Sequence, residues 1–115
     1  IAEARAEVER YLDGFTPPLP QAALAVGGSA RAVAGVVGPK LGRSELEDAV
    51  ELLAETPSDE IVGRYGIDPD RVRTLAAGAV ILAAMQARLG VPLRAVRGGL
   101  REGAVLELAE RRAAA

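Results

Sequence analysis

The chain has 115 residues, enough for one small domain or for part of a larger one. Its 14 basic and 16 acidic residues give a net charge of −2, so no basic field indicates nucleic acid binding. It contains neither cysteine nor histidine, which excludes disulfides, zinc fingers, thiol nucleophiles and histidine general bases. Only 3% of the residues are aromatic, so the core must be built from Ala, Val, Leu and Ile.

The N-terminal part, residues 2–15, is expected to form an amphipathic helix, because apolar residues recur among charged ones. Three prolines between Pro17 and Pro20 then break it. The chain begins at Ile1 rather than Met and is therefore interpreted as an excised piece of a longer protein. No signal peptide is evident, and the longest apolar run, within 75–85, is shorter than the roughly 20 residues a bilayer requires. We therefore expect a cytoplasmic location and no membrane partner.

The apolar run 22–26 is short and lacks polar alternation, which is typical of a strand buried on both faces of a parallel sheet. Gly27 and Gly28 follow it, and Ser29 is expected to cap a helix over residues 30–37. A strand, a glycine turn and a helix can together face phosphate, because free amides at a helix start attract anions. A tight turn with a serine cap explains the same residues without any ligand.

Two further helices are expected before the middle of the chain. Ser44 and Glu47 have the spacing of a capping box for a helix over 45–55, and its expected buried residues are Leu46, Ala49, Val50 and Leu53. A shorter helix follows Pro57 and stops near Gly66. The acidic residues here are explained better by helix caps and solvated faces than by a metal site.

The stretch 66–90 carries the most complete helix signals. Asp68 can cap the first amides, Pro69 suits the first helical position, and Gly90 can close the helix. Gly78 lies in an alanine-rich middle, which predicts that the backbone packs closely against a neighbour. The residues expected to be buried are Val72, Leu75, Ala76, Ala79, Val80, Ala83 and Ala84.

The last part of the chain repeats the order of strand, glycine turn and helix. Residues 91–96 are expected to form a second strand, Gly98 and Gly99 a tight turn, and residues 100–109 a final helix. The expected inward side chains of this helix are Leu100, Ala104, Val105 and Leu108, and residues 110–115 are expected to fray.

Taken in order, these motifs resemble the second lobe of an actin-like ATPase, and specifically the Ppx/GppA family of exopolyphosphatases and guanosine pentaphosphate phosphatases. Residues 25–31 (AVGGSAR) resemble a phosphate loop of that superfamily, and residues 75–83 (LAAGAVILA) resemble its hinge helix. Residues 66–71 (GIDPDR) and the ending at 96–103 (VRGGLREG) narrow the match to Ppx/GppA. The resemblance covers about residues 24–108.

The resemblance implies an activity for the parent protein. Family members use magnesium to remove terminal phosphoryl groups from polyphosphate or guanosine pentaphosphate, in a cleft between two lobes. The family's catalytic glutamate and main phosphate loop lie upstream of the matched portion. The chain is therefore expected to hold no catalytic residue and no metal ligand, and to be inactive alone.

The resemblance also assigns roles within this chain. Gly27, Gly28, Ser29 and Arg31 would face the substrate, and Gly78 would pack against the partner domain. Basic residues expected near the cleft are Arg31, Lys40, Arg43 and Arg97. The closing motif, expected to be structural, contributes Gly98, Gly99, Arg101 and Glu102. Arg73, where the family often has Asp, and Val96, where it often has Ser, leave a diverged or regulatory member as an alternative.

We therefore expect an α/β fold, a partial actin-like (ribonuclease H-like) lobe spanning residues 1–115 as one piece. Two parallel strands, 22–26 and 93–96, would be neighbours wrapped by five or six helices. An exposed sheet edge would favour a homodimer, with or without an exchanged helix. The alternatives are a non-catalytic binding or regulatory module, or part of a sugar kinase or chaperone ATPase.

Overall fold

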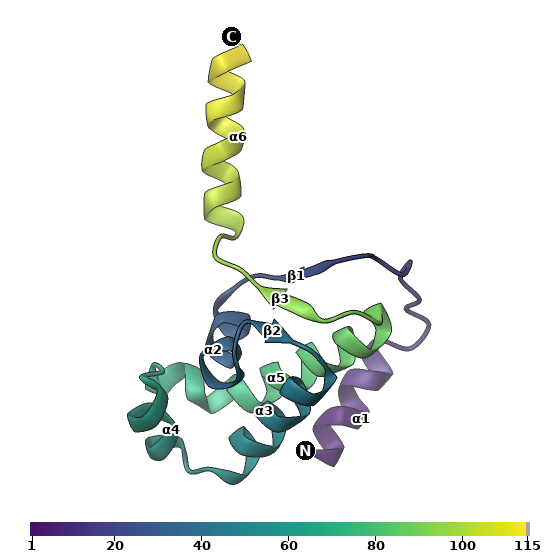
Figure 1. Ribbon diagram of the computed structural model, residues 1–115, viewed down its shortest axis with the longest axis vertical. Coiled ribbons are helices and arrows are strands. Elements are labelled where there is room, and N and C mark those ends of the chain that lie inside the picture. The colour runs from purple at the N-terminus through teal and green to yellow at the C-terminus, as the bar shows by residue number, and fades with distance from the viewer. Residues whose placement is uncertain (115) are drawn as a thin grey trace.

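The computed structural model describes residues 1–114, apart from the side chains of residues 100 and 101. Over this range the chain forms six helices and three strands (Figure 1), which confirms the α/β class. In order, these are α1 (Ala2–Tyr11), β1 (Ala23–Ala25), α2 (Gly28–Val37), β2 (Lys40–Leu41), α3 (Arg43–Glu55), α4 (Ser58–Tyr65), α5 (Pro69–Leu89), β3 (Leu93–Ala95) and α6 (Leu100–Ala114).

The three strands form one mixed sheet in the order β1-β3-β2. The two predicted strands, β1 and β3, are parallel neighbours, as expected, with Leu24 opposite Arg94. The prediction of only two strands, all parallel, is wrong, because β2 pairs antiparallel with β3 and sets Lys40 opposite Arg94. β2 could not be predicted, because two residues are too few to show an alternating pattern.

Helices cover one face of this sheet and leave the other exposed. Ala25, Leu41 and Leu93 point into the core, whereas Leu24 is 65% exposed. The prediction of a strand buried on both faces, wrapped by helices, is therefore wrong. Figure 1 shows the reason. α2, α3 and α5 lie on the same side of the strands, and α6 projects away from the rest of the fold instead of covering the opposite side.

The helix α5 is the centre of the core and matches its prediction closely. Asp68 accepts a hydrogen bond from the amide of Asp70 at 2.8 Å, and Gly90 closes the helix with φ of 76°. An 18-residue window of this 21-residue helix has a mean hydropathy of 1.3, so by length and composition alone the helix could cross a membrane. It packs instead against α1, α2, α3 and α4, as the core helix of this small fold.

Two predicted serine caps are wrong, because their helices begin earlier. Gly27 is the N-cap residue of α2, and Gly42 is that of α3, so Ser29 and Ser44 lie inside the first turns. The Ser44 hydroxyl donates instead to the carboxylate of Glu45, which lowers the pKa of that carboxyl. The predicted buried face of α3 is confirmed: Leu46, Ala49, Val50 and Leu53 are all in the core.

Both terminal helices differ from their predictions. α1 ends at Tyr11 rather than at residue 15. α6 continues to Ala114, where fraying was expected, and every side chain from 102 to 114 is exposed. The inward positions predicted for Ala104, Val105 and Leu108 are therefore wrong, since α6 projects away from the rest of the fold (Figure 1). The Leu100 side chain lies outside the described residues.

Candidate functional site

The two glycine turns lie together at one edge of the sheet. Because β1 and β3 are parallel, their carboxyl ends meet there, and the amide of Val96 donates to the carbonyl of Ala25 at 3.1 Å. Gly27 and Gly98 follow these strands, each with φ of 106°, a value that side-chain-bearing residues rarely adopt. In open α/β sheets this edge is where ligands usually bind.

The start of α2 has free backbone donors. The first bond inside the helix runs from the amide of Arg31 to the carbonyl of Gly27 at 3.1 Å. The amides of Gly28, Ser29 and Ala30 precede it and, within the described hydrogen bonds, have no acceptor. No acidic residue lies in this first turn. The helix end therefore keeps its positive partial charge for an anion.

Arg71, from the first turn of α5, adds a full positive charge. Its guanidinium lies against the Cα of Gly28, so closely that a Cβ at position 28 would overlap it. Thr74 donates a hydrogen bond to the Arg71 carbonyl at 3.3 Å. Among the described ion pairs, none engages Arg71. An arginine beside free amides can bind the oxygens of a phosphate or carboxylate. The sequence reasoning missed this role for Arg71, although its position after Asp68 and Pro69 placed it in the first turn of a helix.

Ser29 and Gly78 hold this turn against α5. A Cβ on Gly78 would lie 3.3 Å from the Ser29 Cβ and 3.4 Å from its Oγ. The expected close approach at Gly78 is therefore present, and its partner is α2 of the same chain. Because the Ser29 side chain lies against α5, only the backbone amide of Ser29 is available to a ligand at the start of α2.

The predicted basic residues are only partly brought together. Arg31 in α2 and Arg97 after β3 are exposed near the two glycine turns. Lys40 lies on the exposed sheet face opposite Arg94. β2 runs antiparallel to β3, so Arg43, which follows β2, lies at the end of the sheet opposite the glycine turns. The expectation that Arg43 lies near the other basic residues of the cleft is therefore wrong.

The closing motif lies at the same edge as the start of α2. Gly98 and Gly99 lead from β3 into α6. A Cβ on Gly99 would lie 3.7 Å from the nearest carboxylate oxygen of Glu102, an ordinary contact. The side chain of Arg101 lies outside the described residues, so its expected structural role stays a prediction.

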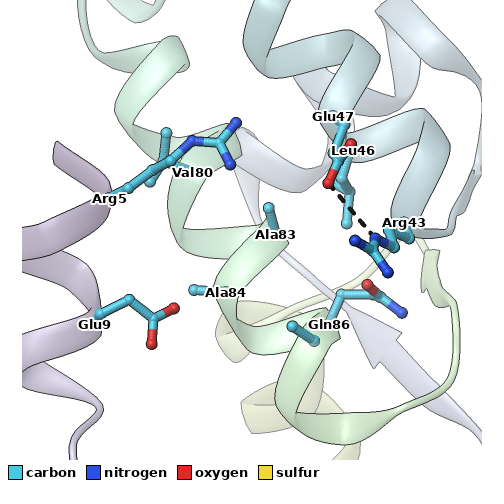
Figure 2. A pocket seen from close by; sticks show the side chains of 10 residues that line it. Arg5, Glu9, Arg43, Leu46, Glu47, Val80, Ala83, Ala84 and Gln86 are labelled. Carbon is cyan, nitrogen blue, oxygen red and sulfur yellow. Dashed lines mark ion pairs between the residues drawn. The ribbon is translucent and has the colours of Figure 1, made fainter. Parts of the chain in front are cut away.

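A separate groove of about 610 Å³ lies between α1, α3 and α5, away from the glycine turns (Figure 2). Small residues of α5 form much of its floor, and charged side chains form its rim. Figure 2 shows Arg5 reaching from α1 toward α3, and Arg43 paired with Glu47 at 3.6 Å. The residues that line it are Arg5, Glu9, Arg43, Leu46, Glu47, Val80, Ala83, Ala84, Gln86 and Ala87. Sequence reasoning did not predict it; the sparse apolar face of α1 was the available signal.

One ion pair joins α1 to α5 beside this groove. Arg88 donates to the carboxylate of Glu9 at 2.8 Å, and this hydrogen bond lowers the pKa of Glu9. Within residues 1–114 no group of three or more acidic side chains could hold a metal ion.

No family model, curated protein or solved structure matches this chain. The resemblance to Ppx/GppA proteins therefore depends on the motifs and their order.

Proposed function

We propose that this chain is the C-terminal part of the second actin-like lobe of a Ppx/GppA-type phosphohydrolase. We propose further that the sheet edge with the two glycine turns, at Gly27 and Gly98, binds a phosphate group of the substrate. The observation that carries the proposal is the guanidinium of Arg71 against Gly28, beside the free amides of α2. The parallel pairing of β1 and β3 supports it, because it brings both glycine turns to that edge.

The residues of this chain would bind and orient the phosphate rather than activate the attacking water. The amides of Gly28, Ser29 and Ala30 and the guanidinium of Arg71 would donate to phosphate oxygens, which carry most charge as the terminal phosphoryl group is transferred. A magnesium ion, when bound by residues outside this chain, would neutralise part of that charge. The glutamate that activates water would also come from outside, so the chain alone would release no phosphate. Its substrate would be polyphosphate or guanosine pentaphosphate in the cytoplasm.

Amide resonances followed by NMR during titration with tripolyphosphate test this proposal. We expect shifts at residues 27–31 and around Arg71, and at least a fivefold loss of affinity in the Arg71→Ala variant. The matched control is Arg73→Ala, which removes an exposed arginine from the same helix and should bind as the wild type does. Equal affinity for Arg71→Ala and wild type would contradict the proposed site. Phosphate release by the chain alone would contradict the assignment of catalysis to residues outside it.

A non-catalytic binding module is the second candidate function, and the groove between α1, α3 and α5 favours it. Its apolar floor and mixed-charge rim suit a small amphipathic ligand or a peptide rather than a polyanion. Tripolyphosphate that shifts no resonance near the glycine turns would favour this candidate. A sugar kinase or chaperone ATPase origin would instead require shifts at the same turns with adenine nucleotides.

A further inference from the structure

The connection between α1 and β1 contains a proline-rich segment, residues 16–20 (TPPLP). Figure 1 shows this connection running along the outside of the molecule. Each of the five residues either is a proline or precedes one. Proline fixes its own φ near about −65° and restricts the residue before it to extended conformations. The segment is therefore constrained to a polyproline II helix, and none of its residues belongs to an α-helix, a strand or a turn.

The exposure of the segment follows the period of a polyproline II helix, which has about three residues per turn. Pro17 and Pro20, three positions apart, are both half-buried against the fold. Pro18 and Leu19 are exposed, Leu19 at 81%. Thr16, three positions before Leu19, is exposed too. One ridge of this helix thus faces the body of the protein, and two ridges face solvent.

The backbone of the segment is also free to bind a partner. Within the described hydrogen bonds, no amide or carbonyl of residues 16–20 takes part. Between positions 11 and 30 the one charged residue is Asp13, so recognition must depend on proline rings, on Leu19 and on carbonyl oxygens. Grooves that bind polyproline II segments are lined by aromatic side chains. Their Trp and Tyr residues supply both flat apolar faces and hydrogen-bond donors for the carbonyls.

We propose that residues 16–20 are a docking segment for a partner protein with an aromatic-lined groove that recognises a polyproline II helix. The partner contacts the two solvent-facing ridges, mainly through Pro18 and Leu19. α1 and β1 hold the two ends of the segment, and the Cδ2 atom of Leu19 lies beside Gly90. Because the segment is already held in the conformation that such a groove binds, less conformational entropy is lost on binding.

This inference does not depend on the proposed phosphate site. The segment precedes β1, whereas Gly27 follows it, so the two sites lie at opposite ends of that strand. Binding at one site is therefore measured separately from binding at the other.

NMR titration of the labelled full-length chain with isolated WW and SH3 domains, which have such grooves, tests the proposal. Prolines have no amide proton, so the reporters are the amides of Thr16, Leu19 and Gln21. We expect at least one of these domains to shift all three resonances and to leave those of residues 27–31 unchanged.

Two pairs of variants locate the contact. Pro18→Ala removes a proline from a solvent-facing ridge and should weaken binding about tenfold. Pro17→Ala is the matched control, because it removes the neighbouring proline from the ridge that faces the fold, and its loss should stay below about threefold. Leu19→Ala should weaken binding about fivefold, whereas Leu24→Ala, at an exposed leucine outside the segment, should bind as the wild type does. Thermal melting followed by circular dichroism checks that all four variants are folded.

Three results would overturn the inference. The absence of any shift at residues 16–21 with every domain at about 1 mM would show that such grooves do not bind the segment. Equal losses for Pro17→Ala and Pro18→Ala would show that the solvent-facing ridges do not make the contact. Shifts confined to the groove between α1, α3 and α5 would place the contact elsewhere on the protein.

Discussion

The units β1–α2 and β3–α6 have the same local order, yet their helices end in different surroundings. Each strand is followed by two glycines, and Gly27 and Gly98 have the same φ of 106°. α2 returns to the core, where Ala30 and Val33 are buried, whereas α6 projects with every residue from 102 to 114 exposed. The glycine turn allows the chain to leave the strand. A close-packed partner, here α5 at Gly78, decides where the helix then lies.

The largest expected effect comes from truncating a buried side chain of α5, the helix against which α2 packs. Leu75 in α5 is 1% exposed, and Leu75→Ala should lower the free energy of unfolding by about 2–5 kcal/mol through lost burial and a residual cavity. Leu108→Ala, in the projecting helix, should leave the unfolding of the body within about 0.5 kcal/mol of wild type. Urea denaturation of dilute protein measures both. Similar losses for the two variants would mean that α6 is packed in solution.

A smaller effect is expected at the contact between α2 and α5. Gly78→Val would drive a side chain into Ser29, and such overpacking costs about 1–3 kcal/mol. Ala77→Val is the control, because Ala77 is exposed on the same helix. Thermal melting compares the two variants. Equal melting temperatures would show that α2 does not depend on the close approach at Gly78.

The two glycine turns can be compared directly. Gly27→Ala forces an L side chain into φ of 106° and should cost about 1 kcal/mol or more, because α2 is held in the core. Gly98→Ala imposes the same strain, but α6 can change its direction without disturbing buried contacts. Its effect on the melting of the body should therefore be small. A larger loss for Gly98→Ala than for Gly27→Ala would contradict this difference between the two units.

The smallest effect concerns α1, which the Glu9–Arg88 ion pair joins to α5. Since the hydrogen bond from Arg88 lowers the pKa of Glu9, the stabilisation by this pair is present at neutral pH and is lost as the pH falls through that lowered pKa, below the ordinary range of a glutamate carboxyl. Glu9→Gln should therefore melt slightly earlier than wild type at pH 7, and the difference should shrink as the pH falls below that range. A difference that grows on acidification would contradict the role of this pair.

The sequence predicted those parts of the fold where several local signals agree. Asp68, Pro69 and Gly90 mark the ends of α5, and the apolar spacing between them gave its buried face correctly. The parallel pairing of β1 and β3 was also predicted correctly, although the burial on both faces that the apolar run 22–26 indicated is wrong. The position of α6 could not be predicted, because an apolar stripe requires a partner without saying whether the same chain provides it.

The candidate site was predicted only in its backbone part. The glycines and free amides of α2 are visible in the sequence, since they depend on local structure. Arg71 could not be connected to Gly28 from the sequence, because 43 positions separate them and only the packing of α5 against α2 brings them together. The two predicted serine caps are wrong for a local reason: α2 and α3 begin earlier than predicted, with Gly27 and Gly42 as their N-cap residues.

The two borders of the sheet have unequal capacity to accept further strands. β2, at one border, has only two residues and passes directly into α3, and such a short strand offers little backbone to an incoming chain. β1, at the other border, can pair with one additional strand. Addition of a strand from another chain is therefore favoured beside β1 and disfavoured beside β2.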